Sequence, residues 1–143
     1  NDPRGFHQLM WGASLKEQAE LAILYSDANI VDYRPKESPA RYGGIEVDGI
    51  VLSTIDNEFA RVTIRYHGEE THKRVLGYLE QTYGAINRLP GQMMRGLNQQ
   101  YNWRGPETEI NLTYESNRDR GYIFIESRTL SPRFNDRISD TAE

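Results

Sequence analysis

The chain has 143 residues, a formal net charge of −4, no cysteine and a mean hydropathy of −0.75. This length suits one domain with a core of its own. The lack of cysteine excludes disulfides, thiol catalysis and zinc–thiolate sites, and no apolar run approaches the roughly 18 residues of a membrane helix. The negative charge disfavours nucleic acid and anionic membranes as partners.

The first predicted element is a helix over 15–24. Ser14 and Glu17 have the spacing of a capping box, in which the serine oxygen accepts the N–H of Glu17 and the carboxylate accepts the N–H of Ser14. Apolar side chains follow as far as Leu24. A capping box directly before apolar residues is typical of a helix start.

The same stretch carries a resemblance. Phe6, Trp11, Gly12 and Ser14 fit the pattern F-x-G-x-x-W-G-x-S, with Gln8 standing where the pattern has its first glycine. This opening resembles that of small secreted or periplasmic bacterial proteins of unknown function. The resemblance implies a periplasmic or secreted location after removal of a signal segment, and a fold of helix, β-meander, helix and hairpin. A cytoplasmic location stays open.

Strands are predicted to follow the first helix. They cover residues 30–34, 45–48, 50–55 and 59–66, with a loop over 36–44 and a hairpin turn at 56–58. The last strand has the clearest alternation, which predicts that Ala60, Val62, Ile64 and Tyr66 face the core.

A second helix is predicted over 69–83. Acidic side chains occupy its first turn, as the helix dipole favours, and Gly84 suits the left-handed residue that ends a helix. Val75, Leu76 and Leu79 form a stripe along it. We expect Leu76 and Leu79 to pack against the buried face of strand 59–66.

The segment 85–100 lacks a clear period, and loops of this length inside a domain are usually functional or disordered. Met93 and Met94 lie in it, and a strand begins at Tyr101. Flexible methionines beside aromatic side chains suit an adaptable contact surface. We therefore predict a partner-binding surface in which Tyr101 and Trp103 are exposed. Its predicted residues are Met93, Met94, Tyr101, Trp103 and Arg104.

A hairpin of strands 109–114 and 122–127 completes the predicted domain, which covers 5–130. The tail 131–143 is expected to be a short helix from Pro132 or disordered. The predicted fold class is α+β, an antiparallel sheet of about five to six strands with two helices packed on one face, in the order α-β-β-β-(β)-α-β-β.

Motifs that carry chemistry are missing. The sequence has no nucleophile elbow, phosphate loop, dinucleotide fingerprint or H-E-x-x-H. His7, His67 and His72 fall in different predicted elements, and a metal would need three or four convergent ligands. We predict no catalytic residue, no metal site and no cofactor.

The leading hypothesis is a non-enzymatic extracytoplasmic binding or adaptor domain that uses the 85–104 segment and the open sheet face to bind a protein or small ligand. A small hydrolase or lyase with an unrecognised carboxylate–histidine site is the first alternative. A structural subunit that self-associates, as a homodimer for example, through a sheet edge is the second.

Overall fold

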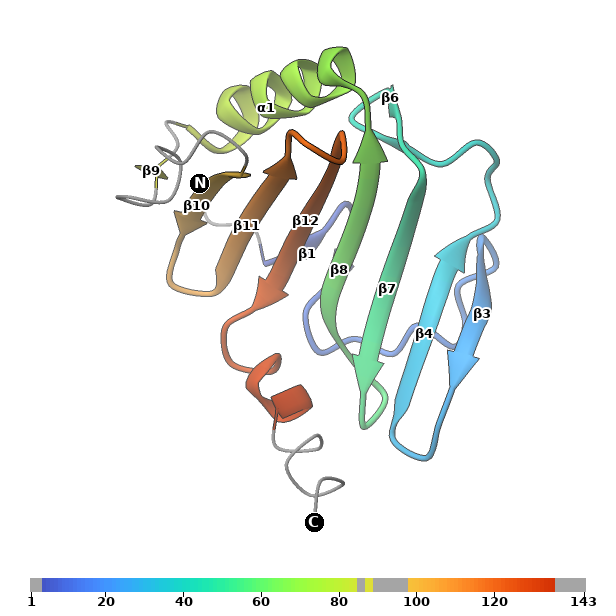
Figure 1. Ribbon diagram of the computed structural model, residues 1–143. Coiled ribbons are helices and arrows are strands. Elements are labelled where there is room, and N and C mark those ends of the chain that lie inside the picture. The colour runs from blue at the N-terminus through green and yellow to red at the C-terminus, as the bar shows by residue number, and fades with distance from the viewer. Residues whose placement is uncertain (1–3, 85–86, 89–97, 136–143) are drawn as a thin grey trace.

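An antiparallel sheet of eight strands forms the body of the protein (Figure 1). The computed structural model describes residues 4–84, 87–88 and 98–135. The spatial order is β3-β4-β7-β8-β12-β11-β10-β9. The strands are β3 (Leu21–Ser26), β4 (Ile30–Pro35), β7 (Gly49–Ile55), β8 (Glu58–His67), β9 (Asn87–Arg88), β10 (Asn98–Arg104), β11 (Thr108–Glu115) and β12 (Arg120–Ser127).

Two small hairpins and one long helix complete the described structure. The hairpins pair β1 (Gly5–Phe6) with β2 (Leu9–Met10), and β5 (Arg41–Tyr42) with β6 (Ile45–Glu46). The helix α1 (Glu69–Tyr83) lies across one end of the sheet, and the N-terminal segment crosses behind the sheet in the view of Figure 1. The fold is α+β with more strand than helix.

The predicted first helix is wrong. Residues 21–26 form β3, an edge strand paired with β4, and turns precede it. The Ser14 hydroxyl donates to the Asn57 side-chain oxygen over 3.1 Å and accepts the N–H of Lys16 over 3.4 Å, so it caps a turn and no helix. Pairing with β4 overrides the local helix signal, because tertiary contacts outweigh capping and propensity. One long helix therefore packs on the sheet in place of the predicted two.

The predicted strand 59–66 and its buried face are confirmed. Val62, Ile64 and Tyr66 are at most 1% exposed and share a core cluster with Leu79, while Leu76 packs against its margin. Ala60 is also buried, but it belongs to a second cluster with Phe134. A register shift between β7 and β8 near Thr54 separates the two clusters, because a bulge breaks the alternation.

The second helix and the position of its end are confirmed. Gly84 ends the helix with φ 96° and ψ −168°, a positive-φ conformation that suits glycine but is not the predicted αL cap, and its N–H donates to the carbonyl of Glu80. The turn at 56–58 is also confirmed, since Asp56 and Asn57 both have positive φ, as a two-residue hairpin requires.

The tail contains a helical turn over 132–135, from which Phe134 is buried beside Ile55. Residues 136–143 lie outside the described part of the chain. Among the residues that the structure does describe, no helix is long and apolar enough to cross a membrane.

Candidate functional site

The predicted partner-binding residues are only partly within the described structure, and two of them are not exposed. Tyr101 and Trp103 are 5% and 7% exposed. They lie on β10 opposite Leu112 and Ile110, on the covered face of the sheet, and the Trp103 indole N–H donates to the carbonyl of Gly84 over 3.0 Å. The prediction that they are exposed is therefore wrong, because strand alternation turns both side chains inward.

Of the other predicted residues, the structure describes only Arg104. Arg104 is exposed at the end of β10. Met93 and Met94 lie outside the described residues. The face of the sheet opposite the core places Thr63, Phe124 and Asn111 side by side on β8, β12 and β11. These three side chains are half-buried.

A polar cluster joins the start of α1 to the sheet. We call it the His72 cluster. Its members are His72 on α1, Tyr66 on β8, Gln99 and Tyr101 on β10, and Tyr114 on β11. His72 is 5% exposed, and its ring stacks on Tyr114 with a centroid distance of 4.0 Å and an interplanar angle of 8°. The cluster thus holds the helix against strands that are distant in sequence.

The hydrogen bonds of the cluster define one arrangement of protons. The Gln99 side-chain oxygen accepts the Tyr101 hydroxyl over 2.8 Å and lies 3.1 Å from the His72 Nε2. Because that oxygen can only accept, Nε2 carries the hydrogen. His72 Nδ1 then accepts the Tyr66 hydroxyl, 2.8 Å away. Both ring nitrogens of a neutral His72 are thereby occupied.

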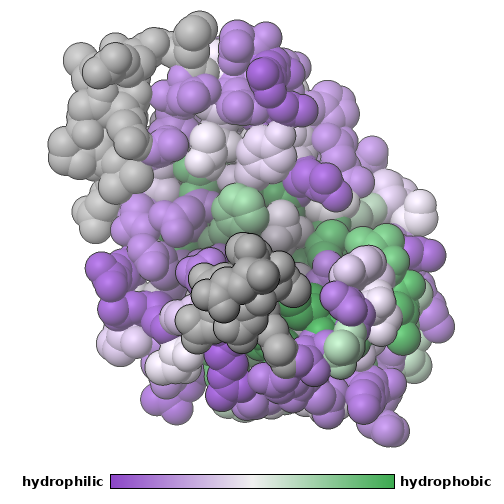
Figure 2. Space-filling model, turned by 60° about the horizontal axis from the view of Figure 1, so that its bottom comes forward, coloured by the Kyte–Doolittle hydropathy of each residue, from purple (hydrophilic) through white to green (hydrophobic). Residues whose placement is uncertain are grey.

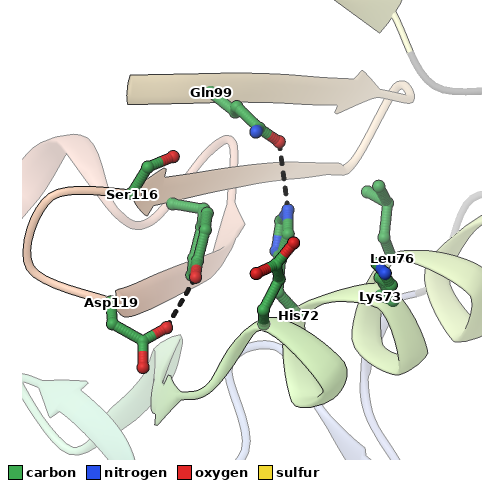
Figure 3. Close-up of a pocket in the computed structure, with 8 residues that line it drawn as sticks. His72, Lys73, Leu76, Gln99, Ser116 and Asp119 are labelled. Carbon is green, nitrogen blue, oxygen red and sulfur yellow. Dashed lines mark hydrogen bonds between the residues drawn. The ribbon is translucent and has the colours of Figure 1, made fainter. Parts of the chain in front are cut away.

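A cavity of about 470 Å³ lies beside the cluster (Figure 3). Glu69, His72, Lys73, Leu76, Gln99, Tyr114, Ser116 and Asp119 line it. Figure 3 shows the hydrogen bond between Gln99 and His72. A second hydrogen bond runs from the Tyr114 hydroxyl to the Asp119 carboxylate. That second hydrogen bond is 2.6 Å long, and Asp119 also accepts the N–H of Gly68 over 3.2 Å.

Burial and hydrogen bonding keep the titratable groups of the cluster neutral. Burial lowers the pKa of His72, against a smaller opposing effect of its hydrogen bond to Gln99. Burial raises the pKa of Tyr66, and the hydrogen bond to Asp119 is the main cause that raises the pKa of Tyr114 to about 12. In this arrangement both nitrogens of the neutral His72 ring bind neighbouring side chains.

The remaining histidines lie apart from this cavity lining. His67 is exposed and its Nδ1 lies 2.8 and 2.9 Å from the two Asp48 carboxylate oxygens, and hydrogen bonding to Asp48 raises the pKa of His67. Within residues 4–84, 87–88 and 98–135, no three histidine, aspartate or glutamate side chains are grouped as a metal site requires.

Exposed apolar side chains are concentrated on the edge strand β3. Ile23, Leu24 and Tyr25 are 64%, 51% and 53% exposed, and we call them the apolar edge. Figure 2 shows hydrophobic surface on the right, the side on which β3 and β4 lie in Figure 1. Among the described residues, β4 is the only strand that pairs with β3, so one side of β3 has a free backbone edge.

The usable part of this edge begins after Leu21. The N–H of Leu21 already donates to the carbonyl of Gln18 over 3.2 Å, within a turn. The register between β3 and β4 shifts between Ile23 and Tyr25, which makes Leu24 the extra residue of a bulge. The bulge adds twist at the point where the apolar side chains are exposed.

Sequence reasoning missed both features, although each left a signal. Leu21 and Ile23 have the period-two spacing of a strand face, whereas the bulge at Leu24 places Tyr25 on the opposite face. His72, Val75 and Leu79 lie at i, i+3 and i+7, so the apolar stripe of α1 extends back to His72 and predicts its burial.

Comparison of the chain with protein-family models, curated proteins and solved structures gives no match. The geometry of the described residues therefore carries the functional argument.

Proposed function

We propose that this chain is a non-enzymatic binding domain that contacts an extended segment of another protein along the apolar edge of β3. The observation that supports this proposal is the placement of Ile23, Leu24 and Tyr25, consecutive and at least half exposed, on an edge strand whose outer side pairs with no other described strand. Exposed edges are normally short, charged or covered, because they template pairing with other chains.

Binding by strand addition would use both the backbone edge of β3 and its exposed apolar side chains. A partner segment laid beside β3 pairs with the free backbone groups, and its side chains bury those of the apolar edge. Burial of apolar area contributes roughly 25 cal/mol per Å². The backbone groups supply affinity and the side chains supply selectivity, so no catalytic group is needed.

The length of β3 favours a short partner segment over a second copy of this chain. Six residues span about 20 Å at the rise of a strand. A stable dimer buries about 1,200 Å² or more, which a contact of two such strands alone does not reach. Self-association through β3 is the competing outcome in the experiment below.

The hydrolase or lyase alternative has less support. The cavity beside α1 does contain His72 and Tyr114, both with displaced pKa values. However, the His72 nitrogens bind Tyr66 and Gln99, and the Tyr114 hydroxyl donates to Asp119. These groups bind one another, so we interpret the cluster as structural.

An extracytoplasmic location is part of the same proposal and is supported by the pattern of Phe6, Trp11, Gly12 and Ser14. Cell fractionation of the source organism, with an antibody against this chain, tests it. Recovery in the periplasmic or secreted fraction is expected, and recovery with the cytoplasmic proteins would contradict it.

Selection from a displayed library of random seven-residue peptides tests the binding surface. We expect peptides with apolar residues at alternate positions to be enriched on the wild-type protein. The best of them should bind the Leu24→Lys variant at least tenfold more weakly. Gln81→Lys is the matched control, because it makes the same charge change at an exposed position of α1 and should bind like wild type.

Two results would overturn the proposal. One is a failure to enrich any peptide, or enrichment of peptides that bind the Leu24→Lys variant equally well. The other is a wild-type dimer in light scattering that the Leu24→Lys variant abolishes, which would assign the edge to self-association.

A further inference from the structure

We propose that the His72 cluster is an acid-sensitive lock on α1, in which protonation of His72 releases the first turns of the helix from β10 and β11. The contacts that hold these turns are the stack of His72 on Tyr114 and the hydrogen bond of His72 to Gln99. This inference is independent of the apolar edge of β3.

A proton on His72 breaks the arrangement at one defined atom. The neutral ring accepts the Tyr66 hydroxyl at Nδ1. When Nδ1 gains a hydrogen, it becomes a donor to the Tyr66 oxygen, and the hydrogen of the Tyr66 hydroxyl loses its acceptor. Tyr66 is 1% exposed, so water does not readily replace that acceptor. Docked α1 therefore disfavours the protonated ring.

The groups that face His72 do not neutralise the added charge. From the sheet, it meets the neutral side chains of Tyr66, Gln99, Tyr101 and Tyr114. On α1 itself, Glu69 lines the same cavity and favours the charged ring, but this effect is smaller than that of burial.

The remaining charges at the cavity do not reverse this balance. Lys73 also lines the cavity, and its ammonium lies 3.8 Å from the Glu70 carboxylate. The Asp119 carboxylate accepts hydrogen bonds from the Tyr114 hydroxyl and the N–H of Gly68. Burial outweighs the opposing effects of Gln99 and Glu69, so the pKa of His72 is lowered in the docked state.

The expected increase in opening of the first turns of α1 follows from the binding of one proton to His72. A released His72 titrates near its ordinary pKa of 6.5, and the docked one at a lower pH. The opening equilibrium of the first turns then increases by at most tenfold per pH unit below that value. Between pH 7.5 and 5.0 we expect an increase of threefold to about thirtyfold.

Hydrogen exchange of backbone amides tests the lock. Amides 73–77 donate within α1, so their protection factors, corrected for the intrinsic exchange rate at each pH, report opening of these turns. We expect protection to fall threefold or more between pH 7.5 and 5.0, while amides of β7 and β8 change less. The His67→Gln variant, which removes an exposed histidine, is the control and should respond like wild type.

Two variants separate the lock from a general effect of acid. His72→Gln removes the titrating group and should make the protection of residues 73–77 independent of pH in this range. Gln99→Glu places a carboxylate against Nε2, which stabilises the protonated ring, so its acid response should disappear or reverse. It also keeps the test available if His72→Gln does not fold. Two results would overturn the proposal. One is a loss of wild-type amide protection at acid pH that is equal in α1 and in the sheet, and the other is the same acid-induced loss in Gln99→Glu as in wild type.

Discussion

The His72 cluster and the apolar edge of β3 differ in how their side chains are satisfied. The cluster is rich in groups that can do chemistry, yet His72, Tyr66, Gln99 and Tyr114 bind one another. The apolar edge has no titratable side chain except Tyr25, yet its side chains are at least half exposed and one side of β3 pairs with no other described strand. An unsatisfied surface indicates interaction more directly than a collection of reactive residue types does.

The two regions also differ in what they contribute: the His72 cluster contributes to stability, and we assign the apolar edge to binding. Removing a member of the cluster leaves buried polar groups unpaired. Replacing a side chain of the apolar edge removes little packing, since these side chains are at least half exposed. Substitutions at the two places should therefore have opposite consequences for folding and for binding.

The largest effect is expected for Ile64→Asp, compared with Ile23→Asp. Ile64 is 0% exposed and Ile23 is 64% exposed. A carboxylate at position 64 is buried without a partner and should cost several kcal/mol, comparable with the total stability of about 5–15 kcal/mol of such domains. Ile23→Asp and Arg65→Asp should stay folded. Thermal melts of the three variants provide the measurement, and unfolding of Arg65→Asp with a stable Ile64→Asp would reverse the assigned faces of β8.

The second largest loss of stability is expected for His72→Ala. The substitution leaves the Tyr66 hydroxyl and the Gln99 oxygen without their partner and opens a cavity beneath α1. We expect a loss of about 2–4 kcal/mol in urea unfolding. His67→Ala is the matched control at an exposed position and should leave the unfolding midpoint nearly unchanged. Equal losses for both histidines would show that burial of His72 is not what matters.

The pH dependence of global stability should be smaller again. Because the folded state lowers the pKa of His72, the unfolded chain binds this proton more tightly, and stability is lost as the pH falls below about 6.5. His67 acts in the opposite sense, since its raised pKa gives a contribution that is present below about 6.5 and lost as the pH rises through the folded-state pKa. Urea midpoints between pH 5 and 8 should show a smaller acid loss in His72→Gln than in wild type. Parallel curves for the two proteins would contradict this assignment.

The smallest effect on stability is expected for Leu24→Lys. Leu24 is the bulge residue of an edge strand and is 51% exposed, so its replacement should change the free energy of unfolding by about 0.5 kcal/mol or less. The same variant should lose peptide binding. If thermal melts showed a loss of several kcal/mol, the apolar edge would be part of the core and not a recognition surface.

Much of the central fold could be predicted, because its signals are local. Strand β8, helix α1 and the turn at Asp56 and Asn57 show their own periodicity or turn residues. The structure of segment 15–24 could not be predicted. Its capping box and apolar residues favour a helix locally, but the apolar residues pair with β4 as a strand. Tyr101 and Trp103 were misplaced because the start of β10 lacks a clear polar alternation. The His72 cluster depends on contacts between α1, β8, β10 and β11 that no local pattern contains.

Amide chemical-shift mapping of the protein with its best library peptide tests the central claim most directly. If the peptide adds to the sheet beside β3, the largest shifts should fall on Ile23, Leu24, Tyr25 and Ser26, with smaller shifts on β4 and none around His72. Shifts centred on His72 and Gln99, with β3 unchanged, would contradict the proposal and assign recognition to the cavity beside α1.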